Sequence, residues 1–259
     1  MPRDFLADKD PLKSMPPLQQ FPVNLTDVTS SGEDAGSEEA LEKANKRGSL
    51  HPYIQMLTDQ DIESCLKLEE ATFPQHQRCS REKFAYRFSK CGELCLGLFT
   101  SAGPDSDVNK LCTAADARPV SSDQPERKAV LLGQITATKT DHDVVKDEDM
   151  EVPNDSNKDR KVGHNDLGHT VGLHSFAIVP EYQDIGLGKV LMKAYIQRIQ
   201  ASGIAERIAL ITYERLIPFY EKLGFEYQGK SDVQYGGESW HNMIHRIADE
   251  QDHEDEDDG

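Results

Sequence analysis

Two glycines one residue apart, Gly186 and Gly188, stand directly before a run whose apolar positions recur at helical spacing, "KVLMKAYIQ". The apolar run "LHSFAIVP" comes before them, so the pattern predicts a strand, a glycine turn and a helix N-terminus. Such a turn can bind an anion, because the first N–H groups of a helix are unpaired and its dipole favours negative charge. Glycine also lets the backbone approach a phosphate without a side chain in between. A tight connection without any ligand is the alternative interpretation.

The spacing of these glycines excludes two well-known phosphate loops. A Walker loop needs glycine where Gln183 stands and Ser or Thr where Val190 stands. A dinucleotide-binding loop needs a third glycine at the position of Leu191. Neither loop is present, so only the sequence on both sides of the turn can indicate which ligand it binds.

The elements around the turn follow from hydrophobic periodicity and from capping residues. Thr58 with Asp61 and, separately, Ser80 are typical helix starts, and Gly224 is typical of a left-handed helix end. The order of helices and strands predicts an α/β domain with a mixed sheet. We expect helices over 58–73, 80–89, 186–201 and 216–223, and strands over 93–100, 129–138, 171–179, 207–214, 225–229 and 239–247.

Composition divides the chain into one domain, at 49–247, and polar flanks. Residues 1–48 mix Pro, Ser, Gly and acidic residues without periodicity, which predicts a disordered leader. The like-charge run over 248–259 predicts an extended acidic tail. Two further polar stretches, 101–128 and 141–166, are expected to be disordered insertions or functional lids.

The overall charge narrows the classes of partner. The formal net charge is -17, which disfavours nucleic acid and anionic membranes and favours cationic partners. No apolar run approaches the roughly 20 residues that span a bilayer, and the start lacks a secretory signal, so we expect a cytoplasmic protein. The 5 cysteines have no spacing typical of a zinc site, and we expect no metal.

The wider sequence around the turn resembles a known family. In "VPEYQDIGLGKVLM", Gln183, Gly186 and Gly188 match the pyrophosphate-loop pattern Q/R-x-x-G-x-G/A of the GNAT superfamily of N-acetyltransferases. The later "IPFYEKLGF", with Tyr220 where the family places its acid, resembles a second motif of that superfamily in the right order. The resemblance implies a GNAT-type mixed central sheet flanked by helices, with acetyl-coenzyme A as co-substrate.

Within this superfamily, residues from about 50 to 245 resemble the arylalkylamine (serotonin) N-acetyltransferases, apart from the two polar insertions. The implied site has three parts: contacts to the acetyl and pantetheine portion, contacts to the phosphates, and an amine pocket. The first comprises Phe176, Ala177 and Ile178, with Tyr220 near the sulfur; the second Gln183, Asp184, Ile185, Gly186, Leu187, Gly188 and Lys189; the third Phe73, Phe176 and Ile211.

Acetyl transfer to an amine needs a base and an acid. With a pKa of about 10.4, on the order of one amine in a thousand is neutral at pH 7, and the leaving thiolate departs more easily when protonated. We expect His174 to remove the amine proton and the neutral phenol of Tyr220 to protonate the thiolate. Strand periodicity places His174 on the same face as Gly172, Phe176 and Ile178. Ordinary core packing is the alternative for both residues.

One position departs from the family. The animal arylalkylamine enzymes have two histidines two residues apart on this strand, and the first position here is Gly172. His169 is nearby but has the opposite parity, so it is expected to point to the other face if the strand extends that far. Proton removal would then depend on His174 with water, or on another relay.

The predicted function is transfer of acetyl from acetyl-coenzyme A to a small primary amine, an arylalkylamine such as serotonin or tryptamine or a polyamine, by direct attack in a ternary complex. Two alternatives stay open: an acetyltransferase acting on protein lysines or N-termini, and a non-catalytic acyl-coenzyme A sensor or scaffold. Ser49, in "KRGSLHP", resembles the phosphorylated segment that binds 14-3-3 proteins in the animal enzymes, which makes regulation through Ser49 a hypothesis.

Overall fold

The computed structural model describes residues 21–22, 43, 45–48, 50–120, 124 and 126–247. It divides the chain into two compact units, of which the first comprises residues 1–135 and 176–191 and the second residues 136–175 and 192–259. Ser49, the acidic tail and most of the predicted leader lie outside the described residues. Within the described part, no helix is both long and apolar enough to cross a membrane.

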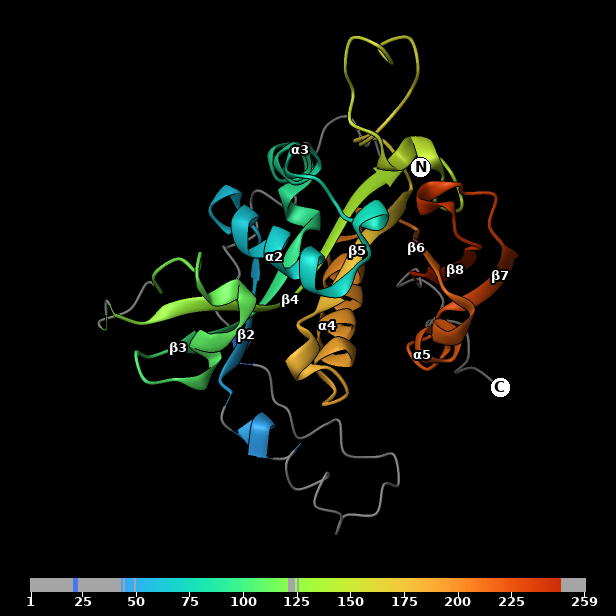
Figure 1. Ribbon diagram of the computed structural model, residues 1–259. Helices are drawn as coiled ribbons and strands as arrows, with labels where there is room; N and C mark the ends of the chain where they lie inside the picture. The colour runs from blue at the N-terminus through green and yellow to red at the C-terminus, as the bar shows by residue number, and fades with distance from the viewer. Residues whose placement is uncertain are drawn as a thin grey trace, which may run out of the picture. The chain divides into compact units, whose positions relative to one another are not determined.

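The first unit is built on antiparallel strands that pair in chain order (Figure 1). The strands are β1 (Phe21–Pro22), β2 (Pro52–Met56), β3 (Leu96–Ala102) and the first part of β4 (Lys128–Thr140). The helices are α2 (Ile62–Thr72) and α3 (Arg81–Cys91). Strand β2 is not predicted by the sequence, whereas both helices are.

The predicted starts of these two helices are confirmed. Asp61 Oδ2 accepts hydrogen bonds from Thr58 N–H and Thr58 Oγ1, each at 2.9 Å, at the short 3-10 turn that leads into α2. The Ser80 hydroxyl accepts a hydrogen bond from Lys83 N–H at 3.3 Å at the start of α3. These side chains satisfy backbone groups that the first turn leaves unpaired.

Strand β5 (Thr170–Ile178) and helix α4 (Leu187–Ser202) each run through both units. In the second unit, β5 pairs in parallel with β6 (Arg207–Thr212). Antiparallel pairing then joins β6 to β8 (His241–Arg246) and β8 to β7 (Glu226–Lys230), and the three strands lie side by side in Figure 1. The predicted α/β class with a mixed sheet is confirmed.

The short helix α5 (Ile217–Glu221) lies against β7 and β8. It is preceded by a 3-10 turn, so the predicted helix over 216–223 is shorter than expected. Gly224 ends it with a φ of 83°, in the left-handed region that the sequence predicts for this position. This turn leads directly into Phe225 and strand β7.

The polar stretches 101–128 and 141–166 contain short 3-10 turns and bury apolar side chains. Val108, Leu111 and Ala114 are buried in the first stretch, and Val145 and Met150 in the second. The expectation of a disordered insertion is therefore wrong for the described parts of both stretches. Val145 and Met150 belong to a buried apolar cluster of the second unit that also contains Ala209, Val233, Trp240 and Ile244.

Candidate active site

The predicted phosphate turn lies in the first unit, between β5 and α4. Asp184 and Gly186 both have positive φ values, 59° and 88°. Val190 N–H donates to Gly186 O at 3.1 Å, which is the hydrogen bond that starts the regular helix. Two residues in the left-handed region reverse the chain within the turn, and glycine meets this requirement at Gly186 without steric cost.

This geometry leaves backbone donors at the start of α4. The N–H groups of Leu187, Gly188 and Lys189 precede the first helical hydrogen bond and have no partner within the helix. The first turn of α4 contains no acidic residue, so the positive end of the helix dipole is not neutralised locally. Ile185 and Leu187 are buried and hold the turn, while Asp184 is exposed. The turn can therefore bind a phosphate.

Gln183 has a structural role that the sequence does not predict. Its side-chain amide donates from Nε2 to the Ile178 carbonyl oxygen at 3.0 Å. Gln183 N–H in turn donates to Pro180 O at 3.3 Å. The side chain thus fastens the turn to the end of β5 and is committed to a protein contact.

The end of β5 lies close to β4 in the first unit. Val179 N–H donates to Leu132 O at 2.9 Å, and a Cβ atom added to Gly133 would lie 2.8 Å from Ala177 O. Ala177 and Ile178 are buried, and Phe176 is half-buried. The three predicted acetyl and pantetheine contacts are thus consecutive residues at the strand end that leads into the phosphate turn.

Phe73, the predicted amine contact of the first unit, lies in extended backbone at the end of α2 and is half-buried. Its carbonyl oxygen accepts a hydrogen bond from Arg78 Nε at 2.8 Å, which closes the loop that follows. At the end of this loop, Cys79 N–H donates to the buried carboxylate of Glu69 at 2.9 Å. The loop that carries Phe73 is therefore fastened at both ends to α2.

The second unit contains His174, the predicted base. His174 is half-buried on β5, and its Nε2 lies 2.7 Å from Oγ1 of the buried Thr138 on β4. The neighbouring residues Leu173 and Ser175 are more deeply buried, as the predicted two-residue alternation requires. Strand β5 begins at Thr170, so His169 lies just outside it, where its Nε2 is 3.4 Å from Asp143 Oδ1.

Tyr220, the predicted acid, is buried in α5 of the second unit. Its ring makes edge contacts with Phe219 and Phe225, at centroid distances of 5.1 and 5.6 Å. Burial raises the pKa of the phenol, and a side-chain hydrogen bond with Thr212 acts in the opposite direction. Tyr220 is therefore neutral at pH 7 and keeps the proton that an acid must donate.

Gly172 and Ile211 are two further residues of the second unit that the sequence analysis singled out. A Cβ atom at Gly172 would lie 3.4 Å from Val145 Cγ2 and 3.6 Å from His174 Cε1. Ile211, the predicted amine contact on β6, is partly buried against the apolar cluster that contains Val145. The second unit thus contains His174, Tyr220 and Ile211, which the sequence predicts as base, acid and amine contact.

Thr138 and Thr212 are contacts that sequence reasoning missed. A signal for Thr138 exists in "ITATKT", where threonines recur every second residue and so share one strand face. Thr212 carries no comparable signal. In the described residues, no group of three or more His, Cys, Asp and Glu side chains could hold a metal ion.

Comparison with known proteins agrees with this geometry. Residues 118–247, just over half of the chain, match the family model of the acetyltransferase (GNAT) domain. The chain belongs to this family, whose members use acyl-coenzyme A. The matched range contains the phosphate turn, His174 and Tyr220.

More particular similarity is to serotonin N-acetyltransferases. The chain is 33% identical over 73 residues to that of Mesocricetus auratus, covering 28% of this chain and 35% of the other. It is 30% identical over 77 residues to that of Macaca mulatta, covering 30% of this chain and 38% of the other. The match therefore spans just over a third of the length of these curated relatives.

Solved structures share the fold at low sequence identity. The loading GNATL domain of CurA from Lyngbya majuscula has a TM-score of 0.51 and 13% identity, covering 76% of this chain and 98% of that one. The NatC complex bound to Gag peptide and CoA has a TM-score of 0.50 and 16% identity, covering 76% and 99%. These structures establish a GNAT fold for the chain.

Proposed function

We propose that this protein transfers acetyl from acetyl-coenzyme A to a small primary amine, an arylalkylamine or a polyamine. The observation that carries the proposal is the turn at Gly186, where the helix N-terminus presents the N–H groups of Leu187, Gly188 and Lys189, which have no partner within the helix. These donors suit the pyrophosphate of a coenzyme A donor. The partial similarity to serotonin N-acetyltransferases supports a small amine as acceptor.

The proposed reaction is a direct transfer in a ternary complex. His174 takes the proton from the ammonium form of the acceptor, directly or through water, and the amine nitrogen attacks the thioester carbonyl carbon. The tetrahedral intermediate then collapses with cleavage of the carbon–sulfur bond. Tyr220 donates its proton to the departing thiolate and is reprotonated by the second proton that leaves the attacking nitrogen. His174 releases its proton to solvent, which yields the acetylated amine and free coenzyme A.

The cysteines support direct transfer over an acetyl-cysteine intermediate. A cysteine nucleophile must form a thiolate, which burial disfavours. Burial raises the pKa of the Cys79 thiol to about 11 and that of Cys65 well above its usual value. The pKa of the half-buried Cys112 is also raised, chiefly by burial. These three thiols are therefore poor nucleophiles near pH 7.

The test is steady-state release of coenzyme A from acetyl-coenzyme A with tryptamine, serotonin, phenethylamine, spermine or a lysine-rich peptide as acceptor. The proposal predicts turnover with the small amines. Turnover confined to the peptide would establish protein acetylation instead. Thermal stabilisation by acetyl-coenzyme A without turnover would indicate a sensor.

Three variants test the assigned roles in the same assay. Tyr220→Phe and His174→Ala are expected to lower kcat by roughly 10²- to 10⁴-fold, the range typical of a lost acid or base. His169→Ala, which removes a histidine next to β5, is the matched control and should retain turnover. Full activity in a folded Tyr220→Phe or His174→Ala protein would refute the corresponding role.

A further inference from the structure

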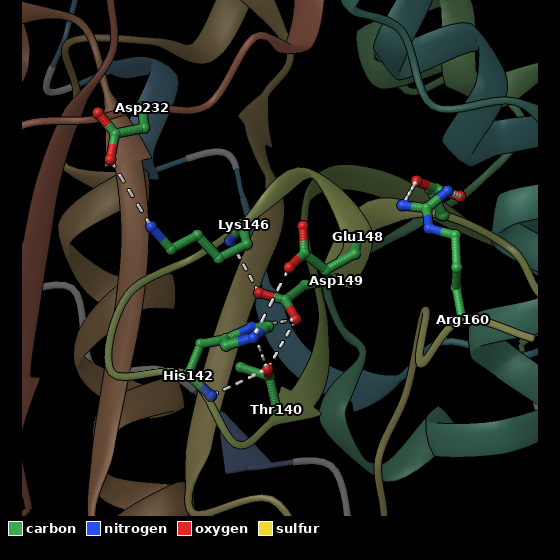
Figure 2. Close-up of polar contacts among 8 residues, drawn as sticks. Thr140, His142, Lys146, Glu148, Asp149, Arg160 and Asp232 are labelled. Atoms are coloured by element: carbon green, nitrogen blue, oxygen red, sulfur yellow. Dashed lines mark hydrogen bonds and ion pairs between the residues drawn. The ribbon is translucent and has the colours of Figure 1, made fainter.

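The stretch 141–166 contains a buried carboxylate in the second unit. Asp149 is 4% exposed, and its Oδ1 accepts a hydrogen bond from Thr140 Oγ1 at 2.7 Å. His142 Nδ1 lies 3.0 Å from the same oxygen, and Lys146 N–H donates to Oδ2 at 2.8 Å (Figure 2). A buried carboxylate with several partners resists displacement, because each broken contact would leave charge unpaired. Asp149 therefore anchors this stretch to the end of β4.

The anchored residue also reaches toward His174. The Thr138 hydroxyl donates to the Asp149 carbonyl oxygen at 3.4 Å, and His174 Nε2 lies 2.7 Å from the same hydroxyl oxygen. A threonine hydroxyl has one proton to donate and lone pairs to accept with. If that proton points to Asp149 O, His174 must donate from Nε2–H, and its lone pair is then on Nδ1.

Apolar contacts from the same stretch support this arrangement. Val145 is fully buried in the cluster with Met150 and Trp240. A Cβ atom added to Gly172 would lie 3.4 Å from Val145 Cγ2 and 3.6 Å from His174 Cε1. Val145 Cγ2 and His174 Cε1 thus both lie close to Gly172.

The contacts from Asp149 through Thr138 to His174 can orient the imidazole, but they cannot transfer protons. A relay would need a group beyond Thr138 that can both accept and release a proton. The acceptor there is a peptide carbonyl oxygen, which has no proton to pass on. His142 contacts the side-chain carboxylate of Asp149 and not this carbonyl oxygen.

We propose that the 141–166 stretch, through Asp149, orients the Thr138 hydroxyl so that it holds His174 in the Nε2–H tautomer. Thr138 and Asp149 are then positioning residues for the base. The expected effect on catalysis rests on the proposed function, because it requires that His174 is the base. The tautomer itself is a property of the free protein.

The test is long-range ¹H–¹⁵N NMR of the histidine rings in the full-length protein without donor or acceptor, at a pH where His174 is neutral. The His174 signals are assigned by their loss in His174→Gln. In the wild type we expect a protonated Nε2 and an unprotonated Nδ1. A wild-type spectrum with Nδ1–H would overturn the proposal, whatever the variants show.

Three variants separate this role from general stability. Thr138→Val removes the hydroxyl at nearly constant volume and should change the His174 ring signals, while Thr138→Ser should retain them. Thr170→Val is the matched control, because Thr170 is a buried β5 residue whose hydroxyl has no hydrogen-bond partner among the described residues. Wild-type His174 signals in a folded Thr138→Val protein would refute the proposal.

Kinetics supply the link to catalysis. Thr138→Val should lower kcat by roughly 10- to 100-fold, as expected for a misplaced catalytic group, with KM for acetyl-coenzyme A unchanged. If His174→Ala retains full turnover while the tautomer depends on Thr138, the proposed role of His174 as base is wrong and the positioning inference stands. The two failures are therefore distinguishable.

Discussion

The Tyr220 phenol is buried in α5 and is hydrogen-bonded to Thr212, the last residue of strand β6. Burial disfavours the phenolate more than this hydrogen bond favours it, so the pKa of Tyr220 is raised. Burial therefore keeps the Tyr220 phenol neutral near pH 7, and it has a measurable consequence for stability.

That consequence is a loss of stability in alkali. Above the ordinary tyrosine pKa of about 10, the unfolded chain releases the Tyr220 proton while the folded protein retains it. The free energy of unfolding is therefore unaffected by this group below about pH 10, and above it falls by up to about 1.4 kcal/mol per pH unit. Urea denaturation at pH 8 to 11 should show a shallower fall for Tyr220→Phe than for the wild type. Parallel curves would contradict the assignment.

A second prediction concerns the affinity of the predicted phosphate turn for coenzyme A. An alanine at Gly186, with a φ of 88°, is strained by about 1–2 kcal/mol and should displace the backbone donors of the turn. We expect Gly186→Ala to raise the Kd for coenzyme A by roughly tenfold or more in calorimetry. Gly203→Ala is the control, since Gly203 also has a positive φ, 60°, in the turn after α4. Equal losses of affinity in both variants would argue against a specific phosphate turn.

Two strand glycines give opposite predictions for stability. An alanine Cβ at Gly133 would lie 2.3 Å from Ile178 Cδ1 and 2.8 Å from Ala177 O, a backbone atom that cannot rotate away. Gly133→Ala should cost on the order of 1–3 kcal/mol of unfolding free energy. The nearest atom at Gly172 is at an ordinary 3.4 Å, so Gly172→Ala should be neutral or stabilise by roughly 0.5 kcal/mol. Urea midpoints measure both; a more stable Gly133→Ala protein would refute the close approach of β4 and β5.

A fourth prediction concerns the stretch 101–128, which is joined to the 3-10 turn before α2 by the pair Arg118–Asp61. Arg118 Nε lies 2.9 Å from Oδ1 of the buried Asp61, and Nη2 donates to Gln55 Oε1 at 2.8 Å. Arg118→Ala leaves a buried carboxylate without this cation and should cost about 3 kcal/mol of unfolding free energy. Lys110→Ala, which breaks the exposed pair with Asp107, should leave the urea midpoint unchanged. An unaffected Arg118→Ala protein would show that Asp61 is satisfied without Arg118.

Local chemistry was enough to predict the helix starts, the strand that carries His174 and the glycine turn between β5 and α4. Thr58 and Ser80 cap their helices through contacts with residues three positions further along the chain. Gly224 has a positive φ because it lies at the end of a helix. Each of these features depends on neighbours that are visible in the sequence. The two-residue period of β5 likewise determined that His174 and Phe176 share one strand face.

Only the tertiary structure decided what contacts these residues. Strand β2 has no clear alternation, and its pairing with β3, 40 to 48 residues further along the chain, establishes it as a strand. The stretch 141–166 is polar on average, yet Val145 and Asp149 within it are buried. The sequence does not predict this, because burial depends on which surface each side chain contacts. The Thr138 contact of His174 spans 36 residues. The sequence therefore determined which groups are available for chemistry, whereas strand pairing between distant segments decided which partner holds His174.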